Sequence, residues 1–301
     1  MVLARFILRG PSQAALVMTT CAMLAILLMP FSWFSAAALI LLVLHQDKEV
    51  AIRATAIASL AIVVMSWVIF GSPLLAAGYL LFLWLPAGLI AYVLKQSVSL
   101  ILSLQLLTVI GLLVITALYL FFPEMGEAWR QAFEQVLKPA IEQSTTQIDQ
   151  AQLDNLLTMF ARSISGLLAI VLVFNVLIGL FIARWWQAGL FNPGGFSREF
   201  KELRLGKVFA AVTVFTMIAN ALIVNDWILG SMLLMVSMTL LQGIAIMHGV
   251  VAKKQLSGHW LFGFYVLLIL IPQVMIFLTI MGLLDAWVDI RKQVSPKIKL
   301  M

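Results

Sequence analysis

The sequence predicts an all-α protein that crosses a lipid bilayer many times. Apolar residues make up 63% of the chain and charged residues 11%, whereas soluble domains have about 45–50% and about 25%. Nine apolar stretches follow one another, and several approach the roughly 20 residues that cross a bilayer core. The charged residues lie mostly in the segments between them. We therefore expect a polytopic transmembrane helix bundle with eight or nine apolar stretches, forming one integral-membrane domain over residues 1–301.

The amino-terminal half contains five of these stretches. Residues 1–10 form a short amphipathic start whose Arg5 and Arg9 suit the headgroup region. Pro30 separates the first two spans because proline lacks the amide hydrogen that a helix interior needs. The second stretch is short, so it is either a tilted span or half of a re-entrant hairpin. The five stretches are residues 13–29, 32–44, 54–70, 74–94 and 98–122.

The carboxyl-terminal half contains four more stretches, residues 163–183, 208–224, 228–252 and 260–284. Pro272 lies near the middle of the last one. A bent or re-entrant element there would change the side on which the tail emerges. Whether 260–284 is a complete crossing stays open.

Residues 123–162 are expected to form an amphipathic helical hairpin on the extracytoplasmic side, with a polar turn over 144–149. Apolar residues recur there at three- and four-residue steps, as on one face of a helix. Six acids oppose two bases in this segment: Glu124, Glu127, Glu134, Glu142, Asp149 and Asp154 against Arg130 and Lys138. The hairpin is either a lid that attracts a cationic ligand or simply a solvated face.

Residues 184–207 form the longest basic interruption between apolar stretches, with five bases against Glu199 and Glu202. Cytoplasmic loops carry an excess of Lys and Arg, so we place this basic loop and the amino terminus in the cytoplasm. If all nine stretches cross, 12 bases lie inside and three lie outside between spans. The four bases of the tail then also lie outside. If one stretch fails to cross, the tail returns inside.

The basic loop also has the features of a docking surface. The turn at 192–195 precedes a short helix that Ser197 is expected to cap, with Arg198, Lys201 and Arg204 available to phosphates or to a cytoplasmic partner. The alternative is an interfacial helix that only anchors the loop.

The polar residues within the apolar stretches are neutral: Gln105, Asn175, Asn220, Gln242 and Gln273. Asn175, Asn220, Gln242 and Gln273 are the candidate ligand-binding residues, although each amide could instead bridge neighbouring helices. Ion-coupled carriers usually need ionisable groups at these depths, so the sequence argues against a self-powered pump.

Motifs of catalysis are missing from the sequence. It contains no phosphate loop, no H-E-x-x-H and no G-x-S-x-G. His45, His248 and His259 lack metal-ligand spacing, and Cys21 is the only cysteine. We therefore expect no enzyme activity, no metal, no cofactor and no nucleic-acid partner; the lipid bilayer is the expected surrounding.

The carboxyl-terminal segment carries Asp285 and Asp289 four residues apart, hence on one helix face, followed by Arg291 and Lys292. We expect the last helix to continue past the bilayer surface until Pro296. Its carboxylates either anchor the helix at the interface or clamp it onto the basic loop, which requires both on the cytoplasmic side.

Two segments, FNPGGFSREFKELRLGK at 191–207 and GLLDAWVDIRK at 282–292, together with the hydropathy of nearly the whole chain, resemble the YybS-like family of uncharacterised bacterial membrane proteins. The resemblance implies a location in the bacterial inner membrane. This family is distantly similar to the substrate-binding subunits of energy-coupling-factor vitamin importers, which is an analogy of fold only.

Two functions are therefore expected. The first is a small-molecule-binding transport subunit that takes its ligand from the outer side and depends on an ATPase partner. The alternative is an assembly protein that docks a cytoplasmic partner through residues 184–207.

Overall fold

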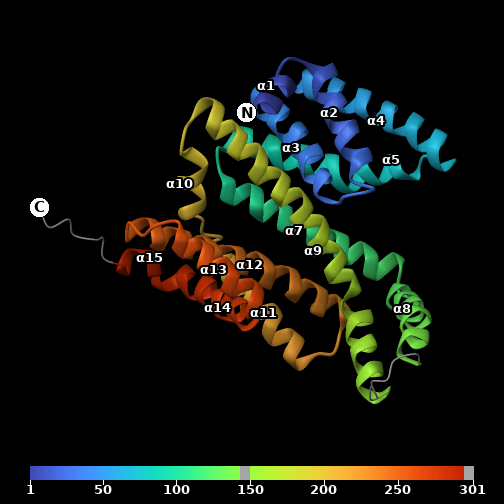
Figure 1. Ribbon diagram of the computed structural model, residues 1–301. Coiled ribbons are helices and arrows are strands. Elements are labelled where there is room, and N and C mark those ends of the chain that lie inside the picture. The colour runs from blue at the N-terminus through green and yellow to red at the C-terminus, as the bar shows by residue number, and fades with distance from the viewer. Residues whose placement is uncertain (143–149, 295–301) are drawn as a thin grey trace, which may run out of the picture.

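The computed structural model describes residues 1–142 and 150–294, and every regular segment among them is helical (Figure 1). The longest helix, α9 (Gln150–Phe191), has 42 residues and so extends over about 63 Å. It runs obliquely between a group of amino-terminal helices and a group of carboxyl-terminal helices (Figure 1). Both groups pack against it, so α9 is the element that joins them.

The amino-terminal group is built around α3, which packs against α2, α6 and α9 and is almost fully buried from Ser35 to Leu42. Pro30 is the first residue of α3, a position where its missing amide hydrogen costs nothing. The group consists of α1 (Val2–Ile7), α2 (Pro11–Leu24), α3 (Pro30–His45), α4 (Lys48–Phe70), α5 (Leu74–Tyr79), the π-helix η1 (Leu80–Trp84) and α6 (Leu85–Ser97).

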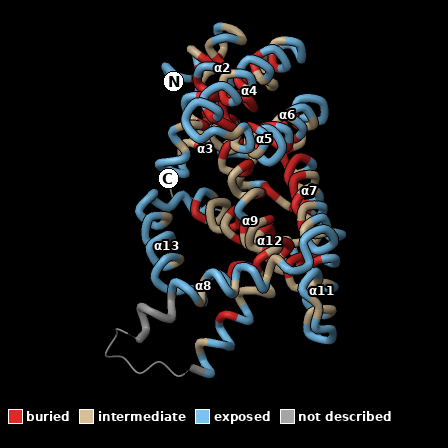
Figure 2. Tube along the Cα trace, turned by 90° about the vertical axis from the view of Figure 1, so that its right-hand side faces the viewer, coloured by how far each residue is buried: buried red, intermediate tan, exposed pale blue. Residues whose placement is uncertain are grey.

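The carboxyl-terminal group is built around α12, which packs against α7, α9, α11 and α14. Buried residues are concentrated along α9 and α12, whereas α13 is mostly exposed (Figure 2). The group consists of α7 (Leu100–Phe121), α10 (Gly195–Lys201), α11 (Lys207–Leu222), α12 (Asp226–Lys253), α13 (His259–Leu270), α14 (Gln273–Val288) and α15 (Ile290–Gln293).

Within the described part of the chain, five helices are long and apolar enough to span a membrane, or six if the bent pair α13–α14 counts as one span. The five are α4, the continuous segment Leu74–Ser97, α7, α9 and α12. The sequence predicts eight or nine apolar stretches, but α3 and α11 are 16 residues long and α2 is 14. Hydropathy gives the length of an apolar run, but the helix inside that run can be shorter. Helix α2 ends before the turn at Pro30, and α11 ends before the turn at Asn225.

The pair α13–α14 begins and ends at one end of the bundle. The two helices meet at Pro272 with a bend of 116°. Helix α13 starts a few residues after Lys253, and the Lys253 ammonium donates a hydrogen bond to the Arg291 carbonyl just after α14 (2.9 Å). The described part of the tail therefore lies at the end that carries the basic loop. Of the two arrangements that the sequence leaves open, this is the one in which one apolar stretch fails to cross.

Helix α8 (Met125–Glu142) packs against the first part of α9. The rings of Phe133 and Phe160 meet edge to face, with centroids 4.7 Å apart, and Arg130 pairs with Asp154 at 2.6 Å. Glu127 and Glu134 also face Arg130, so three acids of α8 and α9 share this one base. The predicted polar turn over 144–149 lies outside the described residues.

Candidate functional site

A cavity of about 450 Å³ lies between α2, α3, α5, η1 and α9. Its polar groups come from Ser32 on α3 and Asn175 on α9. The Ser32 hydroxyl lies 2.9 Å from Asn175 Oδ1 and 2.6 Å from the Met29 carbonyl oxygen. The remaining lining is apolar except for Tyr79, and it includes Gly78, where an added Cβ would meet no atom within 4 Å. The cavity thus combines an apolar wall with one hydroxyl–amide pair.

The π-helix η1 forms one wall of this cavity. Pro86 has no amide hydrogen to donate to the Phe82 carbonyl four residues earlier, so the helix widens by a residue at this point. Side-chain hydrogen bonds attach the widened segment to its neighbours. Tyr79 donates to the Ala22 carbonyl (2.8 Å), and Trp84 donates to the Ser35 hydroxyl (3.0 Å). The wall is therefore held in place on two sides.

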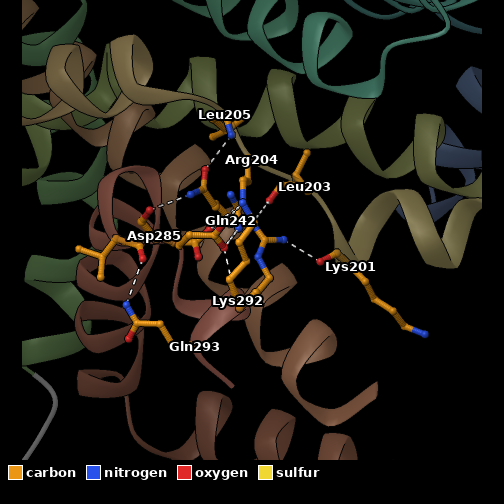
Figure 3. A network of polar contacts seen from close by, with 12 residues as sticks. Lys201, Leu203, Arg204, Leu205, Gln242, Asp285, Lys292 and Gln293 are labelled. Carbon is orange, nitrogen blue, oxygen red and sulfur yellow. Dashed lines mark hydrogen bonds and ion pairs between the residues drawn. The ribbon is translucent and has the colours of Figure 1, made fainter. Parts of the chain in front are cut away.

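A second polar site, the loop–tail cluster, joins Arg204 of the basic loop to Asp285, Asp289 and Arg291 (Figure 3). Arg204 pairs with Asp289, and its Nε lies 3.5 Å from Asp285 Oδ2. Arg291 pairs with the same Asp285 oxygen at 2.7 Å. Asp285 is 1% exposed. The clamp between the tail and the basic loop, one of two predicted roles for these carboxylates, is therefore confirmed as a contact.

Arg291 also fixes the backbone of the basic loop. Its guanidinium donates to the Lys201 carbonyl (2.6 Å) and to the Leu203 carbonyl (2.8 Å). Residues 203–206, after α10, are not helical. The Lys201 and Leu203 carbonyls therefore need hydrogen-bond donors from outside a helix, and the Arg291 guanidinium is that donor.

Two predicted polar residues hold Leu205 from opposite sides. Gln242 accepts from the Leu205 amide and donates to the Gly282 carbonyl, both at 2.8 Å, and Gln105 donates to the Leu205 carbonyl at 2.8 Å. Gln242 is 2% exposed. For Gln105 and Gln242 the structure thus confirms that the amides bridge segments of the bundle.

The other candidate residues do not join these sites. Asn220 is partly buried near the end of α11, and Gln273 is the exposed first residue of α14. Hence the four candidate ligand-binding residues do not form one site, and only Asn175 lines the Ser32–Asn175 cavity. Ser32 and Gly78, which also line it, carry no signal in the sequence that separates them from other small residues in spans.

The predicted docking residues differ in whether other side chains already pair with them. Arg204 pairs with Asp289 and lies near Asp285, whereas Arg198 is exposed. Ser197 does not cap α10, because the helix starts at Gly195 after Gly194 adopts a left-handed conformation (φ 81°). The last helix also ends earlier than predicted, since Asp289 is left-handed (φ 52°) and only the short α15 follows.

Comparisons with protein-family models, curated proteins and solved structures find no match to this chain. The resemblance to the YybS-like family and the docking of a cytoplasmic partner stay predictions. Among the described residues, no group of three or more His, Cys, Asp or Glu side chains is arranged to hold a metal ion.

Proposed function

We propose that this integral membrane protein binds an uncharged, mostly apolar small molecule in the Ser32–Asn175 cavity, as the ligand-binding subunit of a transport system. The observation that supports it most is the hydroxyl–amide pair within an otherwise apolar lining. Ligand sites are typically apolar, with a few polar groups that fix orientation. Every residue that lines the cavity is uncharged, so a charged ligand would lose its hydration without gaining an ionic partner.

The charge distribution supports an orientation with the basic loop and the amino terminus in the cytoplasm. Fourteen described bases lie at the basic-loop end, whereas Arg130, Lys138 and Arg162 lie in or after α8 at the other end. Cytoplasmic ends are the ones enriched in Lys and Arg. We propose eight crossings, with α13–α14 entering and leaving on the cytoplasmic side. The Ser32–Asn175 cavity then lies in the outer half of the bundle.

This orientation makes a prediction for labelling of intact cells. In a Cys21→Ala background, cysteines at Ser197 and Lys292 should both be protected from a membrane-impermeant thiol reagent, because both lie at the basic-loop end. A cysteine at Gln131, which is exposed on α8, should react. Permeabilised cells supply the control, since all three should then react. Labelling of Lys292→Cys but not of Ser197→Cys on intact cells would contradict the arrangement.

Ligand binding makes a second prediction, built on glycine substitutions. Gly78→Leu should abolish copurification of the bound molecule, because the leucine side chain would fill the cavity. No atom lies within 4 Å of the added Cβ, so the side chain has room there. Asn175→Leu should weaken retention about tenfold, since one hydrogen bond to the ligand is lost. Mass spectrometry of molecules extracted from the purified protein measures both effects.

Gly263→Leu on α13 is the matched control for Gly78→Leu. Gly263 is exposed and also has open space at its Cβ position, so the same side chain is added away from the cavity. If Gly78→Leu and Gly263→Leu retain the same small molecules as the unmodified protein, the cavity is not the binding site. The proposed function is wrong if no molecule copurifies with the unmodified protein and if deletion of the gene leaves the uptake of every metabolite in a panel unchanged.

A further inference from the structure

A different part of the surface, the α3–α4–α6 groove, has the shape and charge of a lipid site. The groove encloses about 640 Å³ between α3, α4, η1 and α6, and Leu39, Ile52, Ala56, Gly88 and Tyr92 are among its lining residues. Its apolar wall faces outward from the bundle, and Ile52 on α4 is 65% exposed. In a bilayer, hydrocarbon rather than water meets this face.

The groove continues into a charged pocket of about 520 Å³ at the basic-loop end. Val43, Lys48 and Tyr92 line both, so the two spaces are contiguous. The pocket adds Arg53 and Lys95, together with Asp47 and Glu49. This pocket is called the headgroup pocket below.

The positive charges in the headgroup pocket are available to an anion. The Lys95 ammonium donates to the Gln46 carbonyl at 2.6 Å, a contact that leaves its charge uncompensated. Lys48 makes no ion pair with a carboxylate among the described residues. Arg53 pairs with Glu49 at 3.6 Å, and both side chains are about 70% exposed, so this pair is weak.

The dimensions of the groove match one acyl chain. Along α4 the lining runs from Lys48 to Ser59, which is about 16 Å of helix. The hydrocarbon core of a bilayer is about 30 Å thick, so the groove is about one leaflet deep. Its charged end lies at the basic-loop end, where a phosphate of that leaflet would be found.

We propose that the α3–α4–α6 groove and the headgroup pocket together bind one anionic phospholipid from the leaflet at the basic-loop end. One acyl chain lies along Ala56 and Gly88, and the phosphate lies against Lys48 and Lys95. The site is separate from the Ser32–Asn175 cavity, so it does not depend on the proposed small-molecule ligand. Juxtamembrane lysines attract anionic lipids in this way.

Native mass spectrometry of the full chain tests the proposal, with equal amounts of phosphatidylglycerol and phosphatidylcholine added in detergent. The unmodified protein should retain one phosphatidylglycerol in preference to phosphatidylcholine. Lys48→Gln and Lys95→Gln should each reduce this preference about fivefold, because each removes one charge near the phosphate. Lys254→Gln, an exposed base outside the headgroup pocket, should leave it unchanged.

The acyl chain is tested by filling the groove. Gly88→Leu should abolish retention of the lipid, because the leucine side chain would occupy the groove. The added Cβ meets only Leu39 Cδ2, at 3.8 Å, so the substitution does not disturb the core. Ala56→Leu narrows the groove from the opposite wall, so the result does not rest on one variant, and Gly263→Leu is the control. Equal retention of both lipids, or retention unaffected by Gly88→Leu and Ala56→Leu, indicates bulk lipid only and overturns the proposal. Displacement of the lipid by glycerol phosphate alone would also overturn it, because the acyl chain would then contribute nothing.

Discussion

Asp285→Asn is expected to lower the free energy of unfolding by about 3 kcal/mol or more. Asp285 is 1% exposed, and it lies 2.7 Å from Arg291 and 3.5 Å from Arg204. An asparagine keeps the shape of the side chain but leaves the largely buried Arg291 guanidinium, 11% exposed, without its carboxylate. Removal of one partner from a buried pair costs more than the pair contributes, because the remaining charge keeps its desolvation penalty.

Thermal unfolding in detergent, followed by loss of the monodisperse peak in size-exclusion chromatography, measures this effect. Asp289→Asn is the control, because the Asp289 side chain is 19% exposed and asparagine tolerates the left-handed backbone of that position. It should cost about 1 kcal/mol. A midpoint shift for Asp285→Asn no larger than that for Asp289→Asn would show that the buried Asp285 carboxylate stabilises the fold no more than the more exposed Asp289 does.

Gly243→Val is expected to have a similar effect, about 3 kcal/mol or more, through a different cause. Helices α12 and α14 pack with their backbones in contact, and a Cβ on Gly243 would lie 2.1 Å from the Leu278 carbonyl oxygen. Backbone atoms cannot turn aside as a side chain can, so the two helices must separate. The separation would also break the Gln242–Gly282 hydrogen bond (2.8 Å).

The same unfolding measurement, with Gly263→Val as the matched control, isolates the clash. Gly263 has no atom within 4 Å of its Cβ position, so the control changes the residue type without an obstruction. The Gly243→Val protein should lose its folded peak at a temperature well below that of the control. Equal midpoints for the two variants would mean that α12 and α14 are not in close contact.

The helical class and the locations of the helices were predictable, because both follow from local properties of the chain. An apolar run of about 20 residues with few charges satisfies its backbone hydrogen bonds only as a helix within a bilayer. The amphipathic face of residues 125–141 reports the helix α8 in the same way. The number of full-length spans was not predictable to the same degree, since α2 ends at Leu24 and α11 at Leu222, before the ends of the apolar stretches at residues 29 and 224.

The candidate sites were predictable only in part. Asn175 was among the predicted ligand residues, but its partner Ser32 is 143 positions away in the sequence, and nothing in the local pattern joins them. Likewise the pairing of Asp289 with Arg204 was one of two alternatives, because the sequence leaves the side of the tail open. The contact was decided by the 116° bend at Pro272.

The sequence by itself determined the class of this protein, the order of its helices and the concentration of positive charge around residues 184–207. Each of these depends on composition and on spacing within a few turns. The tertiary structure alone decided which polar groups meet, where two helices approach at glycine, and at which end the tail emerges. The reason is physical: a buried carboxylate such as Asp285 is stable only beside particular partners, and those partners, Arg204 and Arg291, are brought to it by the packing of α14 against α12.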